Sequence, residues 1–122
     1  MSGYTRVLSS ESLNDTTVYN ESGDKLGEIE DIMIDLPTGT VAYAVLSFHH
    51  GFLNMSEKLF ALPWEALTID ESNEQIILNV SKEKLEKAEG FDKDNWPDFA
   101  DPTFQRNLYS YYGYSVSDRM AA

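Results

Sequence analysis

One short stretch of the chain gathers the carboxylates that could do chemistry: Glu28, Glu30, Asp31 and Asp35. A pair of carboxylates can perform general acid–base catalysis when one is buried and the other is solvated. These four are spaced for alternating exposure along a strand edge. No nucleophile, phosphate-binding loop or cofactor motif accompanies them. We therefore expect no catalytic residues and a protein that is not an enzyme.

Metal ligands are the second kind of chemistry to consider. His49 and His50 are the two histidines of the chain, and neighbouring residues of an extended segment point to opposite faces. They cannot easily share one ion. Residues Asp92–Asn95 begin like a calcium loop, but Trp96 stands at the third ligand position and Thr103 where a bidentate glutamate is needed. The chain has no cysteine, which excludes sulfur-ligated metals. Together these observations lead us to expect no metal site and no cofactor.

Composition limits the classes of partner. The 122 residues fit one globular domain with a modest core and an extension. Nine basic residues against twenty-one acidic ones give a formal net charge of -12, which repels nucleic acids and anionic membranes. The N-terminus lacks the apolar core of a signal peptide, and no apolar run is long enough to span a bilayer. We expect a soluble cytoplasmic protein with no nucleic-acid partner and no membrane insertion.

Two apolar runs in the middle of the chain predict central strands. The first, Val41 to Phe48, is rich in β-branched and aromatic residues and is apolar on both faces, with Val41, Tyr43 and Val45 on one of them. The second run, Leu59 to Trp64, contains Pro63. Because proline has no N–H to donate, we expect this strand to stop or bend near Pro63.

The preceding strand contains a break in its alternation. Ile32, Ile34 and Leu36 share one face, but Ile29 lies an odd number of residues away. A bulge near Glu30–Asp31 would restore the phase. Bulges increase the curvature of a strand, and curvature allows a small sheet to close into a barrel.

The remaining strand signals are short and lie about ten residues apart. A turn containing Gly23, which can adopt positive φ, separates two of them. Before this hairpin, Ser10 could cap a single helical turn over Ser10 to Leu13, but these residues are interpreted as a lead-in loop. About six short strands at this spacing are typical of a small sandwich or barrel. The additional strands are expected at 18–19, 25–27, 67–69 and 75–80.

Two helices are predicted after the strands. Ser81 is a good N-cap and Gly90 a good C-terminal cap for the first. Asp101 followed by a proline begins the second, which we place at Pro102 to Tyr112. The apolar stripe of this second helix consists of Phe104, Leu108, Tyr111 and Tyr112.

The segment from Phe91 to Tyr114 holds eight of the fifteen aromatic residues. Ordering such a segment costs about as much free energy as burying all of these rings would gain, so nearly all of them must find a surface. We expect a second copy of the chain to provide part of it, which predicts a homodimer. The candidate interaction surface is Phe52, Leu53, Met55, Trp96, Phe99, Phe104, Tyr109, Tyr111, Tyr112 and Tyr114.

The stretch from Val18 to Val80 resembles the PRC-barrel family, known from the cytoplasmic domain of the photosynthetic reaction centre H subunit and from a ribosome maturation factor. Residues 91–97 and 111–113 are similar to the extension of many stand-alone bacterial members. One departure is His49-His50-Gly51, where members often have a pair of glycines. The segments that carry the resemblance are Val18–Asn20, Gly23–Ile29, Ile32–Asp35, Thr38–Gly39, Val41–Leu46 and Ala61–Trp64.

The resemblance implies a mainly β fold: a small closed barrel of about six strands in residues 1–80, followed by a helical, aromatic-rich extension in residues 81–122. It also implies a non-enzymatic module for protein–protein interaction or assembly, which the aromatic tail predicts to be self-associating. A barrel that senses a small molecule or a metal ion is the alternative. A ribosome-associated assembly factor is a further alternative by analogy of fold. The protein partner is not identified by the sequence.

Overall fold

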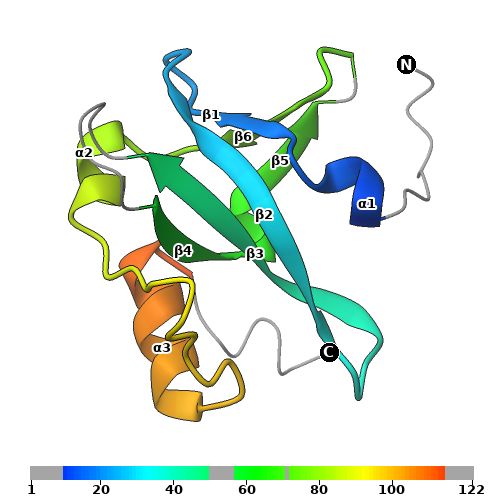
Figure 1. Cartoon of the computed structure of the whole chain (residues 1–122), viewed down its shortest axis with the longest axis vertical. Coiled ribbons are helices and arrows are strands. Elements are labelled where there is room, and N and C mark those ends of the chain that lie inside the picture. The colour runs from blue at the N-terminus through cyan, green and yellow to red at the C-terminus, as the bar shows by residue number, and fades with distance from the viewer. Residues whose placement is uncertain (1–9, 50–56, 71, 115–122) are drawn as a thin grey trace.

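Six strands form one strongly curled sheet in the order β4-β3-β2-β1-β6-β5 (Figure 1). The computed structural model describes residues 10–49, 57–70 and 72–114. All neighbouring strands are antiparallel except β1 and β6, which are parallel. The strands are β1 Thr17–Tyr19, β2 Lys25–Asp35, β3 Thr40–His49, β4 Glu57–Pro63, β5 Leu67–Asp70 and β6 Gln75–Leu78.

The mainly β fold with six strands and a C-terminal helix is as predicted. Among the described residues, no ladder joins β4 to β5, and the sheet is curled rather than closed by backbone hydrogen bonds. A single 3-10 turn, η1 (Trp64–Ala66), connects these two strands. Strand β4 ends at Pro63, which is paired with Tyr43, as the missing proline N–H predicts.

Two bulges set which side chains face the core. Glu30 is an extra residue on β2, so Ile29 and Ile32 both lie in the core, which confirms the predicted bulge. A second irregularity makes Ala42 an extra residue on β3. Val41 therefore packs against the core while Tyr43 faces outward, and the prediction that these two share a face is wrong.

The turn between β1 and β2 is closed by Asn20. Its backbone N–H donates to the carbonyl oxygen of Asp24 at 2.9 Å, and its side-chain Oδ1 accepts from the Asp24 N–H at 2.9 Å. Gly23 has a φ of 91°, as predicted for this turn. Before β1, residues Ser10–Leu13 form one helical turn, α1, so the predicted lead-in loop is wrong.

Both predicted tail helices are present. Helix α2 spans Lys82–Glu86, and Ser81 accepts from the Lys84 N–H at 3.0 Å as its N-cap. Helix α3 spans Pro102–Tyr111, and Asp101 accepts from the Thr103 N–H at 3.0 Å. Helix α2 ends one turn before Gly90, so the prediction of Gly90 as its C-terminal cap is wrong.

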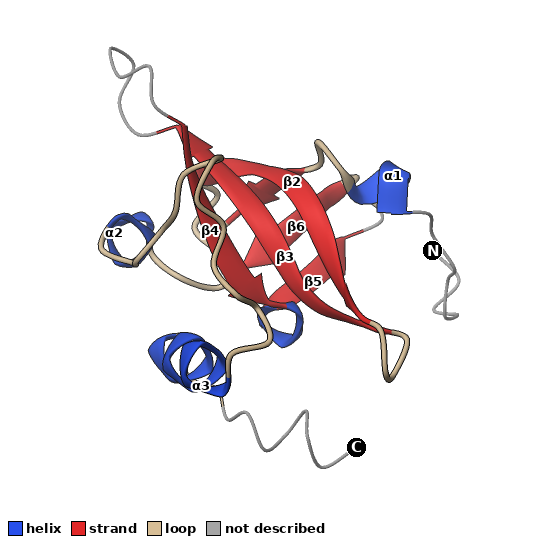
Figure 2. Cartoon of the chain, turned by 60° about the horizontal axis from the view of Figure 1, so that its bottom comes forward, coloured by secondary structure: helices blue, strands red, loops and turns tan. Residues whose placement is uncertain are grey.

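The core lies on the concave side of the sheet and includes residues of the extension. Leu85 and Ala88, at and just beyond α2, and Tyr112, at the end of α3, belong to the same buried cluster as the strand residues. Helices α2 and α3 lie on the β4 side of the sheet, whereas α1 lies on the opposite side (Figure 2). The strand residues of this cluster are Val18, Leu26, Ile29, Ile32, Ala44, Leu46, Phe48, Phe60, Leu62, Ile76 and Leu78.

Candidate functional site

The aromatic tail docks on the outer face of its own sheet. Tyr43, the outward residue of β3, is in ring contact with Phe99, Phe104 and Tyr109 at centroid distances of 5.3, 6.3 and 6.2 Å. Such tilted and edge-to-face pairs add to the free energy gained by burial. Met33 of β2 packs against the same cluster. The surface that these tail aromatics need is thus provided within one chain.

The tail also covers the edge of β4. Leu59 and Phe91 exchange two backbone hydrogen bonds, of 3.0 and 2.8 Å, in an isolated antiparallel bridge. Gly90 permits this approach, because a Cβ atom there would lie 2.7 Å from the Leu59 carbonyl oxygen and 2.9 Å from the Phe60 ring. An edge strand paired in this way is protected from pairing with other chains.

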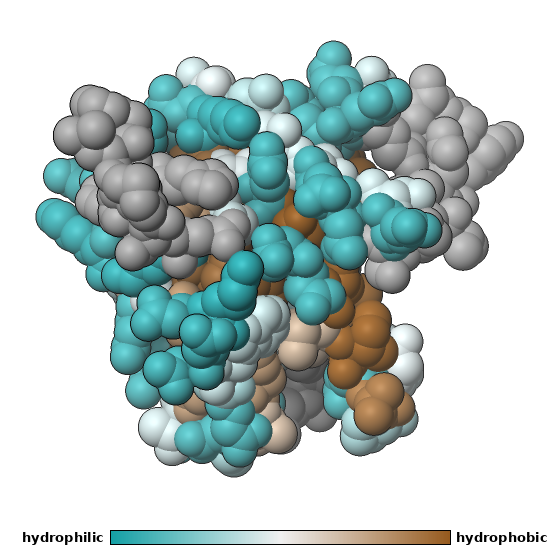
Figure 3. Space-filling view, in the orientation of Figure 1, coloured by the Kyte–Doolittle hydropathy of each residue, from teal (hydrophilic) through white to brown (hydrophobic). Residues whose placement is uncertain are grey.

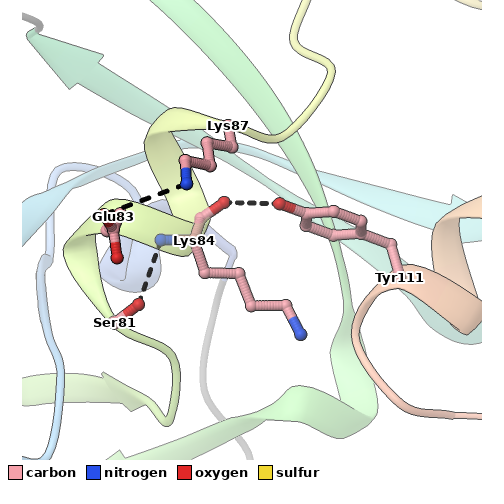
Figure 4. Close-up of polar contacts among 5 residues, drawn as sticks. All are labelled: Ser81, Glu83, Lys84, Lys87 and Tyr111. Carbon is pink, nitrogen blue, oxygen red and sulfur yellow. Dashed lines mark hydrogen bonds and ion pairs between the residues drawn. The ribbon is translucent and has the colours of Figure 1, made fainter.

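Two tyrosine hydroxyls fix α3 in place. Tyr109 donates to Oε1 of Glu65 at 3.1 Å, just after β4. Tyr111 donates to the backbone carbonyl of Lys84 at 2.6 Å, and Figure 4 shows this bond joining α3 to α2. The Lys84 ammonium group also lies 5.1 Å from the centre of the Tyr111 ring. These contacts hold the two tail helices in a defined relative position.

A groove of about 720 Å³ lies between α3, the segment that follows α2, and the start of β4. Its apolar lining comes from α3, its C-cap and the segment that follows α2, and its polar groups are one ammonium, two carboxylates, two amides and two tyrosine hydroxyls. We call this site the tail groove. Its lining residues are Lys58, Ala88, Glu89, Gly90, Phe91, Asp92, Asn95, Pro97, Phe104, Asn107, Leu108, Tyr111 and Tyr112.

Tyr112 is the most unusual residue of the tail groove. It is 7% exposed, and its hydroxyl has no hydrogen-bond partner among the described residues. Burial, with a smaller effect of the neighbouring Tyr111, raises the pKa of this hydroxyl above its ordinary value. A buried hydroxyl without a partner costs free energy, so it marks a position where a ligand or partner group could supply a hydrogen bond.

The predicted interaction residues fall into three groups. Trp96, Tyr111 and Tyr114 are 38%, 37% and 39% exposed. Phe99 and Phe104 are half-buried, and Tyr109 and Tyr112 are buried. The predicted residues Phe52, Leu53 and Met55 lie outside the described residues.

Sequence reasoning missed several residues of the tail groove. Lys58 and Asn107 lie far apart in the chain, and no local pattern links them. The predicted stripe of α3 also omitted Tyr109, which is 1% exposed and is the most deeply buried aromatic of the tail. The signal that could have placed Tyr109 is its position between Leu108 and Tyr112, both of which were in the stripe.

The carboxylates of β2 have local partners. Glu28 lies 3.6 Å from the Lys25 ammonium group, and both are solvent-exposed. Asp31 accepts from the next backbone N–H at 2.8 Å, and Asp35 accepts from the Thr38 hydroxyl at 2.7 Å. In the part of the chain that the structure describes, no group of three or more His, Cys, Asp or Glu residues is placed to hold a metal ion.

The other candidate metal ligands lie apart from this strand. His49 is the last residue of β3, and His50 lies outside the described residues. Residues Asp92–Asn95 form a turn that is closed by a hydrogen bond of 3.0 Å from the Asn95 N–H to the Asp92 carbonyl. Asp92 and Asn95 thereby line the rim of the tail groove.

Comparison with known proteins identifies the barrel. No curated protein matches the chain. Among the described residues, no helix is long and apolar enough to cross a membrane. The profile of the PRC-barrel domain matches residues 6–85, which is more than half of the 122 residues and includes all six strands. The chain therefore belongs to the PRC-barrel domain family.

Proposed function

We propose that this protein is a non-enzymatic protein–protein interaction module that binds its partner at the tail groove. The observation that carries the proposal is the exposure of Tyr111, which lines the tail groove and is 37% exposed after the tail has docked. Trp96 and Tyr114, outside the groove lining, are 38% and 39% exposed. Tryptophan and tyrosine are enriched at the centres of protein interfaces. Rings held by the docked tail lose little conformational entropy on binding, which favours affinity.

Self-association is the form of binding that we expect at this surface. The lining of the tail groove includes apolar side chains and charges of both signs, so a second tail can approach without a local charge conflict. The net charge of -12 opposes the approach of two copies at long range. Salt screens this repulsion, so a dimer held by the tail aromatics should become more stable as salt is added.

The test is the mass in solution, measured by light scattering over a wide dilution range at low and high salt. We expect a dimer that dissociates on dilution, and Trp96→Ala should weaken it about tenfold or more. Asn79→Ala, at an exposed position outside the tail, is the matched control and should leave the mass unchanged. A monomer at every concentration and salt level would exclude self-association.

Binding to a different protein can be tested at the same surface. A photo-crosslinking amino acid at position 107, on the wall of the tail groove, should capture the partner in cells. The Trp96→Ala change should reduce capture, and a crosslinker at position 79 should not capture the same protein. Equal capture from both positions would contradict the proposal.

A second candidate function is the binding of a small molecule in the tail groove. Its volume of about 720 Å³ is in the range of small-molecule sites, and the partnerless Tyr112 hydroxyl offers a buried polar group. A ligand that binds the native state must raise the melting temperature by mass action. Thermal shifts against a panel of metabolites and divalent ions test this, and a shift that survives Tyr112→Phe would contradict a role for that hydroxyl.

A further inference from the structure

The far half of β2 has an unpaired edge. On the side away from β3, strand β2 pairs with β1 only from Lys25 to Glu28. Two further backbone hydrogen bonds, of 3.0 and 2.8 Å, join Ile29 to residues 16 and 15. Asp15 has a φ of 67°, and the chain leaves the sheet there toward α1. From Glu30 to Asp35, no described residue pairs with this edge.

The Glu30 bulge decides which backbone groups point to the open edge. Both backbone groups of Ile29 point away from β3, because they bond to residues 15 and 16. The extra residue shifts the alternation by one, so Ile32 and Ile34 are the next to point away. The bond from the Ile32 N–H to the Asp31 carboxylate, outside the β3 ladder, agrees with this. The N–H and C=O groups of Ile34 therefore face the open edge.

Apolar side chains flank these free backbone groups. Ile34 is 49% exposed and Leu36 is 84% exposed, where the β2–β3 hairpin projects from the rest of the sheet. Figure 3 shows a hydrophobic surface over the end of this hairpin. Exposed edge strands are commonly protected by charged side chains, proline or bulges; the segment from Glu30 to Leu36 has a bulge and carboxylates but neither lysine nor proline. The edge thus combines unpaired backbone groups with exposed apolar side chains.

The charge of the barrel indicates the chemistry of the partner. Residues 10–80 contain thirteen acidic residues and two basic ones, Lys25 and Lys58. Along the open edge, the carboxylates of Asp31 and Asp35 flank a segment whose Ile32 and Ile34 side chains point to the opposite face of the sheet. An added strand would place apolar residues beside the isoleucines and basic residues beside the carboxylates. The β2 strand of a second copy would instead oppose carboxylate with carboxylate.

We propose that the open edge of β2 binds an extended segment of another protein in which apolar and basic residues alternate. The segment adds a strand to the sheet, with backbone hydrogen bonds to Ile34 and side-chain contacts to Ile34 and Leu36. It continues the line of β1 past the point where this chain turns away at Asp15. This surface is separate from the tail groove, so either proposal can fail without the other.

Synthetic ten-residue peptides are the probes. A peptide of alternating lysine and valine should bind and protect the Ile34 amide from hydrogen exchange, measured by NMR. A peptide of alternating glutamate and valine should not protect it. Replacing a central valine of the first peptide by proline removes one N–H, and the affinity measured by fluorescence anisotropy should fall roughly tenfold.

Matched variants locate the binding. Ile34→Lys should weaken binding of the lysine–valine peptide roughly tenfold, whereas Asn79→Lys, at an exposed position off the edge, should not. Asp35→Asn is a second variant that keeps an acceptor for Thr38 and should weaken binding roughly threefold. Tyr111→Ala in the tail groove should have no effect.

Three results would overturn the proposal. The first is peptide binding that is unchanged in both the Ile34→Lys and Asp35→Asn proteins. The second is protection of the Ile34 amide without peptide that grows with protein concentration, which would identify a second copy as the occupant. The third is protection without peptide that disappears when residues 115–122 are removed, which would identify the C-terminal segment of the same chain.

Discussion

The two faces of the β2–β3 hairpin differ in whether the aromatic tail covers them. On the outer face, Met33 and Tyr43 lie under the tail, in a cluster with Phe99 and Tyr109. On the other face, at the end of the same hairpin, Ile34 remains half exposed. Both faces present apolar side chains, but among the described residues the chain covers only the outer one.

The difference shows how the extension changes the barrel. The tail buries part of the outer face of the sheet and pairs with the edge of β4. The aromatic rings of the tail that stay exposed form a new surface. The barrel and the tail also differ in charge. Residues 10–80 carry a formal charge of -11. Residues 81–122 contain six basic and eight acidic residues, which gives a formal charge of -2. The barrel suits a basic partner, whereas the tail can meet a surface of either sign.

The largest loss of stability should come from a substitution in the cluster between the tail and the outer face of the sheet. Tyr109→Ala removes a ring that is 1% exposed, and we expect a loss of about 3–5 kcal/mol in the free energy of unfolding, since a large buried side chain leaves a cavity. Urea denaturation measures this. Tyr114→Ala, at a ring that is 39% exposed, is the control and should cost about 1 kcal/mol or less. Equal losses would mean that the tail is not held through Tyr109.

The contact between the tail and β4 should be the next most sensitive. A Cβ at Gly90 would lie 2.7 Å from the Leu59 carbonyl oxygen, a backbone atom that cannot move without breaking the bridge to Phe91. We expect Gly90→Ala to cost about 1–3 kcal/mol in unfolding free energy and to speed exchange of the Leu59 amide. The neighbouring exposed change Glu89→Ala should do neither. A Gly90→Ala protein with native stability would contradict the close approach.

Where the sequence predicted the fold correctly, the signal was local. The bulge at Glu30 could be recognised because Ile29 and Ile32 are out of phase for a regular strand. The end of β4 follows from the absence of an N–H at Pro63. The bulge at Ala42 could not be recognised, because both faces of β3 are apolar and a shift by one residue leaves no trace in the pattern.

Where the prediction from sequence was wrong, the deciding contact was with a residue far away in the chain. Gly90 follows a helical pattern and looks like a cap, but its role depends on Leu59 in another element. The buried side of α3 packs against Tyr43, and helical periodicity alone does not identify Tyr43 as its partner. The aromatic residues of the candidate site were predicted from the composition of the tail. Lys58 could not be predicted, because only the folded chain brings it to the tail groove.

Two buried tyrosines of the tail should respond differently to loss of the hydroxyl. Tyr109→Phe removes the hydrogen bond to Glu65 and should cost about 1 kcal/mol of unfolding free energy. Tyr112→Phe removes a hydroxyl without a partner and should be neutral or slightly stabilising. Denaturation of the two variants at neutral pH tests this, and a larger loss for Tyr112→Phe would show that its hydroxyl has a partner in solution.

The stability of the protein at alkaline pH should depend on the Tyr112 hydroxyl. Burial raises the pKa of Tyr112 in the folded state, so above about pH 10 the unfolded chain loses this proton before the folded one does. The unfolded state then binds fewer protons, and the stability falls as the pH rises. Tyr112→Phe should remove this part of the alkaline loss, measured by denaturation from pH 9 upward. An identical pH dependence in both proteins would contradict the burial of the hydroxyl.

A small effect on stability is also expected on the uncovered face. Ile34→Thr keeps the β-branched shape at a half-exposed position and should change the free energy of unfolding by about 0.5 kcal/mol or less. The neighbouring Met33→Thr, under the tail, should cost about 1 kcal/mol or more. Denaturation of the two variants side by side makes the comparison. If Ile34→Thr were the more costly, its side chain would already be covered in the free protein, and the edge of β2 would not be open to a partner strand.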